Sequence, residues 1–151
     1  MLGAQSAPDK LPHGNALPPP AEGQEQAVLA TVNALLSSFS AGDSAAMLRW
    51  VYPDGRVTAT GMRSNGSGLR QQSWTQFGAR ITPQATFAET INDPAVEVDG
   101  DAAMVWAPFV VRVGGKVSNC GVDHFDLVRD NGAWKVMNLT FSSRVEGCPA
   151  K

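Results

Sequence analysis

The fold is decided by the stretch from residue 99 to residue 145, DGDAAMVWAPFVVRVGGKVSNCGVDHFDLVRDNGAWKVMNLTFSSRV. Apolar and polar side chains alternate along most of this stretch, which is the pattern of β-strands with one buried face. Turn-forming residues interrupt the alternation at Asp99-Gly100, Gly114-Gly115 and Asp130-Asn131-Gly132. Together with the segment that begins at Ala85, this punctuation predicts four long antiparallel strands.

Upstream of the strands, the apolar spacing is helical. From Glu22 to Ala41, apolar residues recur every three or four positions, at Val28, Leu29, Val32, Leu35, Leu36 and Phe39. This spacing predicts a long amphipathic helix. Gly42 is expected to end that helix, and Asp43 to cap a second, short helix.

Three further segments connect the helices to the strands. Residues 56–60 are rich in β-branched side chains and predict a strand, residues 61–68 predict a loop, and residues 69–81 predict a third helix. Helices followed by a meander of strands are typical of an α+β fold. We expect a curved, cone-shaped antiparallel sheet wrapped around three N-terminal helices, with a ligand pocket between them.

Composition limits the classes of partner. The chain has 151 residues, 43% of them apolar and 17% charged, with a formal net charge of −2, and this predicts one folded domain. Near-neutral charge without a run of Lys and Arg argues against a nucleic-acid partner. No apolar stretch is long enough to predict a membrane span.

The two ends of the chain differ from the middle. Residues 1–22 are rich in proline and predict a disordered tail or the remnant of a signal peptide, while the folded domain is expected to span residues 23–147 and a C-terminal tail residues 148–151. Small residues at positions 2–7 are similar to a signal-peptide cleavage region. We therefore expect a periplasmic or secreted protein, with a cytoplasmic protein as the alternative.

The two cysteines also bear on the cellular compartment of the protein. Cys120 and Cys148 are consistent with one disulfide in an oxidising compartment, and with two free thiols in the cytosol. Neither lies in a CxxC pattern, which argues against a redox-active or zinc site.

Hairpin pairing predicts which side chains share a face of the sheet. If Val113 faces Lys116, Trp106 lies opposite Asp123, and if Arg129 faces Trp134, Thr140 lies opposite Asp123 as well. The predicted ligand-binding face then carries Met104, Trp106, Asp123, Phe125, Asn138 and Thr140. The opposite face, with Val122, His124, Asp126, Met137, Leu139 and Phe141, is expected to form a homodimer contact or to pack against helices.

Asp123 is the main candidate for chemistry. A carboxyl group beside Trp106 in a water-poor pocket is expected to have a raised pKa and to act as an acid or a hydrogen-bond donor. The alternative is an ordinary carboxylate that bonds Thr140 at a solvated rim. Tyr52, Asp54 and His124 are candidates for proton transfer, and His124 has a packing role as its alternative.

Metal and cofactor sites are not predicted. His124 and Asp126 have the spacing of a metal-binding pair, but such a site needs a second folded histidine. The other histidine, His13, lies in the predicted tail.

The order of elements resembles the nuclear transport factor 2-like (NTF2-like) superfamily, particularly bacterial SnoaL-like domains, over residues 22–145. The resemblance includes Ala41-Gly42-Asp43 after the long helix and Trp134-Lys135-Val136 in the last hairpin, and it implies a cystatin-like fold with a cone-shaped pocket. Residues 122–125 are also similar to the strand of bacterial ketosteroid isomerases whose protonated aspartate donates to an enolate oxygen. The tyrosine and base of those isomerases fall near Leu35 and Ala59, so the resemblance implies the pocket without the isomerase activity.

Three functions follow as expectations. The leading one is binding of a small apolar or carbonyl-containing molecule in the pocket. The second is a lyase, isomerase or cyclase in which Asp123 is the acid or oxyanion donor. The third is a non-catalytic dimeric interaction module. A second carboxylate, tyrosine or histidine within reach of Asp123 would favour the enzyme.

Overall fold

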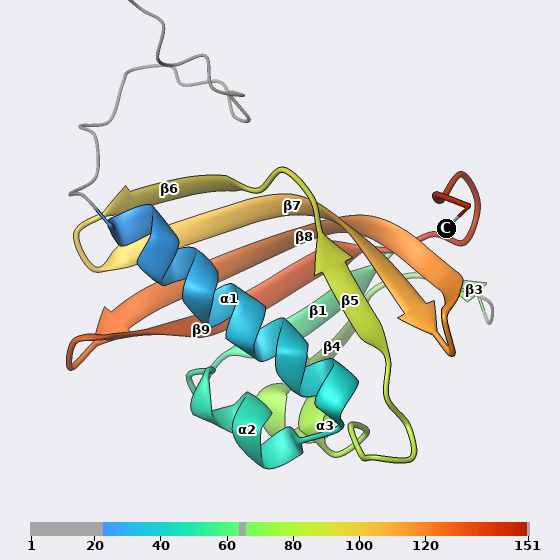
Figure 1. Ribbon diagram of the computed structural model, residues 1–151, viewed down its shortest axis with the longest axis horizontal. Helices are drawn as coiled ribbons and strands as arrows, with labels where there is room; N and C mark the ends of the chain where they lie inside the picture. Colours follow the sequence, from blue (N-terminus) through green and yellow to red (C-terminus); the bar gives the residue numbers. More distant parts are fainter. Residues whose placement is uncertain (1–22, 64–65, 151) are drawn as a thin grey trace, which may run out of the picture.

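The computed structural model describes residues 23–63 and 66–150, and the predicted tail at residues 1–22 lies outside the described residues. The described chain forms three helices, α1 (Gln24–Ala41), α2 (Ser44–Arg49) and α3 (Trp74–Gly78) (Figure 1). Its strands are β1 (Arg56–Thr60), β2 (Met62–Arg63), β3 (Gly66–Ser67), β4 (Arg70–Ser73), β5 (Ala88–Ile91), β6 (Ala95–Asp99), β7 (Ala102–Val113), β8 (Lys116–Asp130) and β9 (Ala133–Ser142).

The first two helices follow the sequence prediction. Helix α1 ends at Gly42, whose φ of 67° is the left-handed conformation that glycine adopts without strain. The Asp43 carboxylate caps α2 by accepting a hydrogen bond from the Ala46 N–H at 2.9 Å. Within the described part of the chain, no helix is long and apolar enough to cross a membrane.

The third helix is shorter than predicted. The expected helix over residues 69–81 is wrong in its first part, where Arg70–Ser73 form strand β4 and pair antiparallel with β1. The Ser73 hydroxyl accepts from the Gln76 N–H, and the Gln76 side chain accepts from the Ser73 N–H. This reciprocal capping box starts α3 at Trp74. The predicted loop at 61–68 likewise contains the short β2–β3 pair.

The sheet is curved and mixed. Its strand order is β4-β1-β9-β8-β7-β5, and β6 also pairs with β7. All the predicted turns are present, but the first predicted strand is divided into β5 and β6 at residues 92–94, where Asp93 has a φ of 44°. The expectation of a purely antiparallel sheet is wrong for one pair, because β1 runs parallel to β9. A long connection separates these two strands, as a parallel pair requires.

Two β-bulges change the predicted register. Val113 does face Lys116, but Ser118 is an extra residue on β8, so Trp106 pairs with His124 rather than with Asp123. Arg129 does face Trp134, but Met137 is an extra residue on β9, so Asp123 pairs with Phe141 rather than with Thr140. Each one-residue shift exchanges the faces of the strand beyond it.

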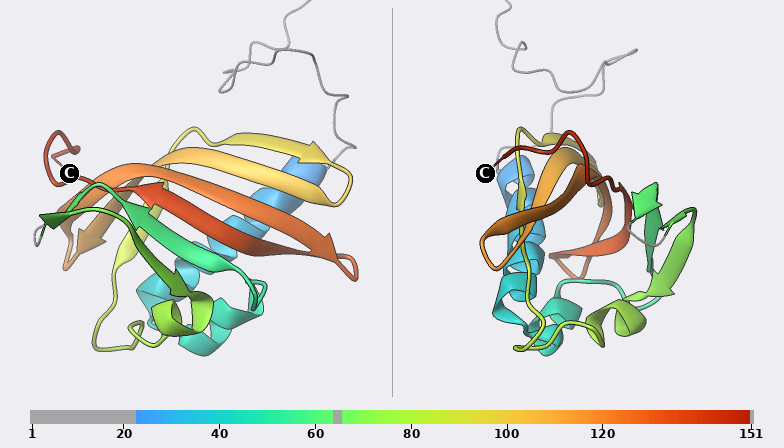
Figure 2. Two further views of the ribbon diagram at one scale, coloured as in Figure 1. Left: turned by 180° about the vertical axis from the view of Figure 1, so that it is seen from behind. Right: turned by 90° about the vertical axis from the view of Figure 1, so that its right-hand side faces the viewer.

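The hydrophobic core lies between helix α1 and the concave face of the sheet. Figure 2 shows the sheet curving around α1, with α2 and α3 together at one end. The α1 residues that were predicted to be buried contact inward-facing side chains of the long strands, among them Val105, Phe125, Leu127 and Leu139. Leu139 is 2% exposed and Phe141 packs on this core. The predicted dimer face is therefore wrong for these two residues, which point inward.

The cysteines form a disulfide, as the first of the two sequence interpretations predicts. Cys120 and Cys148 are bonded, with Cα atoms 5.7 Å apart and a sequence separation of 28. The bond holds the predicted C-terminal tail against β8, beside backbone hydrogen bonds between Cys120 and Arg144.

Reducing this disulfide is expected to lower the free energy of unfolding by about 2–4 kcal/mol, because the reduced unfolded chain regains loop entropy. Urea unfolding with and without reductant measures the change. The variant Cys148→Ala is the control, since it should match the reduced protein and no longer respond to reductant. An unchanged unfolding midpoint on reduction would contradict the prediction.

Candidate ligand pocket

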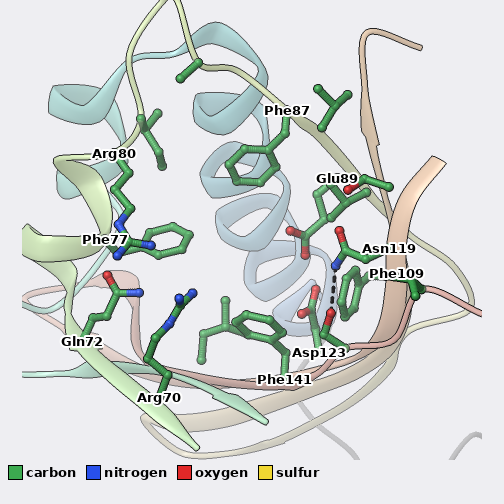
Figure 3. A pocket seen from close by; sticks show the side chains of 18 residues that line it. Arg70, Gln72, Phe77, Arg80, Phe87, Glu89, Phe109, Asn119, Asp123 and Phe141 are labelled. Carbon is green, nitrogen blue, oxygen red and sulfur yellow. Dashed lines mark hydrogen bonds between the residues drawn. The ribbon is translucent and has the colours of Figure 1, made fainter. Parts of the chain in front are cut away.

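A cavity of about 520 Å³ lies between the concave face of the sheet, helix α3 and the segment that connects α3 to β5. Its walls are largely apolar and come from Phe77, Ile81, Phe87, Phe109, Val111, Leu139 and Phe141. Polar side chains line two sides of it, namely Glu89, Asn119 and Asp123 on one and Arg70, Gln72 and Arg80 on the other (Figure 3). Its volume and its few polar groups are typical of a site for a small organic molecule.

Two carboxyl groups meet at one side of the cavity. Asp123 is 1% exposed and points inward from β8, while Glu89 comes from β5. Figure 3 shows the two carboxyl groups directed toward one another. Their strands lie on either side of β7, so the curvature of the sheet brings residues distant in sequence together.

The electrostatics of this pair favour the protonated form of Asp123. Burial raises the pKa of Asp123 well above its usual range, and the Glu89 charge and a hydrogen bond to Glu89 raise it further. Burial also raises the pKa of Glu89, while the hydrogen bond from Asp123 opposes that rise. Two adjacent buried carboxyls cannot both ionise at low cost, so a proton held by the pair is favoured on Asp123, which donates to Glu89.

The pair has hydrogen-bonding capacity left over. Among the described residues, none bonds Asp123 Oδ2 or Glu89 Oε2, although both atoms are shielded from solvent. The nearby Asn119 amide already donates to Ser143 Oγ at 3.1 Å. An unbonded buried polar atom is costly, so the two oxygens are available to a polar group of a ligand.

The raised pKa of Asp123 leads to a prediction about stability. The folded chain holds this proton more tightly than the unfolded chain, so the protonated Asp123 adds to the free energy of unfolding. This stabilisation is fully present below the ordinary pKa of Asp, and it is lost as pH rises through the pKa of Asp123 in the folded chain. Each pH unit between the two pKa values is worth about 1.4 kcal/mol. Asp123→Asn removes this titration, so we expect the variant to be at least as stable as the parent at neutral pH.

Thermal unfolding between mildly acidic and neutral pH measures this effect. The parent should lose stability over that range more steeply than Asp123→Asn. Asp54→Asn, at an exposed turn, is the control and should follow the parent. A variant that is clearly less stable than the parent at neutral pH would show that the Asp123 carboxylate is ionised and stabilising.

The structure places only part of the predicted site at the cavity. Phe125 points inward from β8 as predicted, but it is fully buried in the core rather than lining the cavity. Met104, Trp106, Asn138 and Thr140 lie on the outer face of the sheet, because the Ser118 and Met137 bulges exchange the faces. Trp106 is 43% exposed there and so does not desolvate Asp123. Thr140 is not the cross-strand partner of Asp123 either, because Asp123 pairs with Phe141.

The other catalytic candidates lie elsewhere. His124 is on the outer face, with its ring centroid 5.9 Å from that of Trp106. Tyr52 follows α2, and its N–H donates to the Val136 carbonyl at 2.8 Å. Asp54 is exposed in the turn before β1. None of these three residues lines the cavity with Asp123. The expected rise in the Asp123 pKa is confirmed in direction, but the cause is burial and Glu89.

Sequence reasoning missed Glu89, Arg70 and Arg80. A signal for Glu89 was present, because Phe87, Glu89 and Ile91 alternate with more exposed residues and Glu89 is the charged member of the inward set. The positions that correspond to the isomerase tyrosine and base, Leu35 and Ala59, are buried apolar residues. Glu89 is therefore a second carboxyl at a position that the resemblance did not indicate.

Comparisons with known proteins show the fold. No family model matches the chain, and no curated protein matches it. Solved structures do match, among them an NTF2-like protein of unknown function from Shewanella baltica, with 15% identity and a TM-score of 0.61 over 84% of this chain and 98% of the other. An NTF2-like protein with a cystatin-like fold from Novosphingobium aromaticivorans matches with 18% identity and a TM-score of 0.64, covering 82% of each chain.

A third structure, an NTF2-like protein from Cytophaga hutchinsonii, matches with 13% identity and a TM-score of 0.65 over 80% of this chain and 98% of the other. The chain therefore has the NTF2-like, cystatin-like α+β fold that its sequence resembles. The narrower likeness to SnoaL-like domains stays a prediction. A shared fold does not select a function, so the function is argued from the cavity itself.

Proposed function

We propose that this protein binds a small, largely apolar molecule in the cavity, with a carbonyl or hydroxyl oxygen of the ligand accepting the Asp123 hydrogen bond in place of Glu89. One observation carries this proposal: the buried Asp123 carboxyl, whose Oδ2 has no hydrogen-bond partner among the described residues, faces an apolar-walled cavity of about 520 Å³. Burial of the apolar part of such a ligand supplies affinity, and the carboxyl supplies orientation.

The test compares two ligands of similar size, benzylacetone, which has a ketone oxygen, and butylbenzene, which lacks it. Chemical-shift titration should show tighter binding of benzylacetone. Asp123→Leu should weaken its binding by a free energy of about 1–3 kcal/mol, whereas Asp123→Asn, which keeps a donor, should largely retain it. Thr140→Val, on the outer face, is the control. Equal binding of the two ligands, or full binding by Asp123→Leu, would contradict the proposal.

A second candidate function is proton transfer at a carbon next to a carbonyl group. The observation that favours it is the second carboxyl, Glu89, beside Asp123. Glu89 would accept the proton from that carbon, the electrons of the C–H bond would form the C=C bond of an enol, and Asp123 would stabilise the charge that develops on oxygen. Isomerases, lyases and cyclases share this step.

The same ketone tests the enzyme. In D₂O, the parent should exchange the hydrogens next to the carbonyl of benzylacetone for deuterium faster than buffer does, as measured by NMR. Glu89→Gln should abolish the acceleration while still binding the ketone. Exchange at the buffer rate in the parent would limit the proposal to binding.

The outer face of the sheet supports a separate proposal, that two chains associate through β7, β8 and β9. Trp106 is 43% exposed on this face, with its ring centroid 5.9 Å from that of His124. A large exposed aromatic side chain is a common feature of protein contacts. Light scattering is expected to report twice the chain mass, and Trp106→Glu to shift the protein toward a monomer. A parent protein that stays monomeric at high micromolar concentration would refute the dimer.

A further inference from the structure

The cavity has a second polar side, which the proposed function does not use. Arg70 and Gln72 lie on β4, and Arg80 follows helix α3. All three line the cavity, and Figure 3 shows their side chains reaching into it from the side opposite Glu89 and Asp123. Phe77 lies beside them, and Phe87, Phe109 and Phe141 occupy the space toward the carboxyl pair. The cavity is therefore apolar in the middle and polar at both sides.

The arginines do not serve as counter-ions of the carboxyl pair. The pKa values of Glu89 and Asp123 respond to burial and to each other. An arginine close to either carboxyl would instead favour its ionised form and lower its pKa. Within the described part of the chain, Arg80 also makes no ion pair with an acidic residue. The Arg80 charge is thus available to a ligand that enters the cavity.

Charge and shape indicate what that group is. Guanidinium groups remain protonated, and their planar set of N–H donors matches the two oxygens of a carboxylate. Arg70 and Arg80 bring positive charge to this side of the cavity, whereas the carboxyl pair lies on the opposite side. A carboxylate matches the planar donors of a guanidinium and can be joined to the apolar group that the phenylalanine walls require.

We propose that the ligand is an apolar carboxylic acid that also carries a carbonyl or hydroxyl group, an oxo- or hydroxycarboxylate. Its carboxylate lies at Arg70 and Arg80, its apolar part contacts the phenylalanines, and its uncharged oxygen accepts from Asp123. This inference rests on the proposed function at Asp123 and adds the anionic end. Arg80 is exposed and Arg70 half-buried, so the carboxylate lies toward solvent and the uncharged oxygen lies deeper.

The experiment uses benzoylpropionate, benzoylbutyrate and benzoylvalerate, each compared with its own methyl ester. The series varies the separation of ketone and carboxylate, and esterification removes only the charge. Calorimetric titration at neutral pH should show at least one acid binding about tenfold or more tightly than its ester. Raising the salt concentration should reduce that preference, because the carboxylate lies near solvent.

Variants assign the preference to its residues. Arg80→Gln should lower the affinity for the acid toward that for the ester and leave the ester unchanged, and Arg70→Gln should act in the same direction. Arg49→Gln, on an exposed residue of α2 outside the cavity, is the matched control and should keep the full preference. Circular dichroism checks that each variant is folded. If Arg70→Gln does not fold, the assignment of the preference is tested by Arg80→Gln alone.

The outcomes separate the two proposals. If acids and esters bind equally well and Asp123→Leu weakens both, the inference is overturned and the proposed function stands. If the acids bind more tightly but Arg80→Gln keeps the preference, the assignment to this side of the cavity is overturned. If none of the six compounds binds, the proposed function fails and the inference fails with it.

Discussion

Gly55→Ala is expected to destabilise the protein by about 3 kcal/mol or more, because an added methyl group would collide with backbone rather than with a movable side chain. A Cβ atom at Gly55 would lie 1.5 Å from the Met137 carbonyl oxygen and 2.6 Å from its carbon. Relief requires β1 to move away from β9 at the Met137 bulge. Urea unfolding measures the loss.

Gly100→Ala is the matched control for Gly55→Ala. Gly100 has a φ of 61° but open space around its Cβ position, so alanine there meets only the conformational cost of about 1–2 kcal/mol. The comparison separates backbone contact from backbone conformation. A Gly55→Ala protein as stable as Gly100→Ala would show that β1 does not approach the bulge this closely.

The Met137 bulge explains why the sequence predicted the strands but not their faces. Alternation and turn residues give the number and ends of β7, β8 and β9, and the residue pairs next to each turn are correct. A bulge adds one residue without altering composition or obvious periodicity, yet it exchanges every face beyond it. The pairing predicted for Trp106 and Thr140 failed for this reason.

The contacts that hold the Met137 bulge are long-range. The Arg56 N–H donates to Asn138 Oδ1 at 2.9 Å, and Asn138 Nδ2 donates to Asp126 Oδ2 at 2.8 Å. Asn138 therefore acts on the outer face as part of the bulge, not as a ligand-binding residue. Single-sequence reasoning cannot pair Arg56 with Asn138, because 82 residues separate them.

The candidate site was predictable in part. Alternation along β8 assigned Asp123 to the same face as Phe125, and a carboxyl buried on that face is expected to have a raised pKa, which the structure confirms in direction. Glu89 was not assigned, because the link between β5 and β8 depends on the curvature of the sheet and on both strands flanking β7. Arg70 was placed on a helix, and only its location in β4 directs it to the cavity.

Trp74→Ala is expected to destabilise the protein by about 3–5 kcal/mol, the range for removing a fully buried large aromatic side chain. Trp74 is 0% exposed, and its ring contacts Phe77 edge to face with centroids 5.9 Å apart. Its Nε1–H also donates to the Met137 carbonyl at 2.9 Å. The residue thus joins α3, which lines the cavity, to the bulge that sets the register of β9.

Two phenylalanine variants separate the roles of the Trp74 ring and its N–H group. Trp74→Phe keeps most of the volume but leaves the Met137 carbonyl without this donor, at a cost of about 1–3 kcal/mol. Trp134→Phe is the matched control, because Trp134 is also buried, yet its Nε1 has no hydrogen-bond partner among the described residues. Loss of ring area there, with a weaker contact to the Arg129 guanidinium 5.0 Å from the ring centroid, should cost less than about 1.5 kcal/mol. If urea unfolding gave equal losses for the two, the Trp74 hydrogen bond would not stabilise the bulge, and packing alone would hold the register that points Leu139 and Phe141 into the cavity.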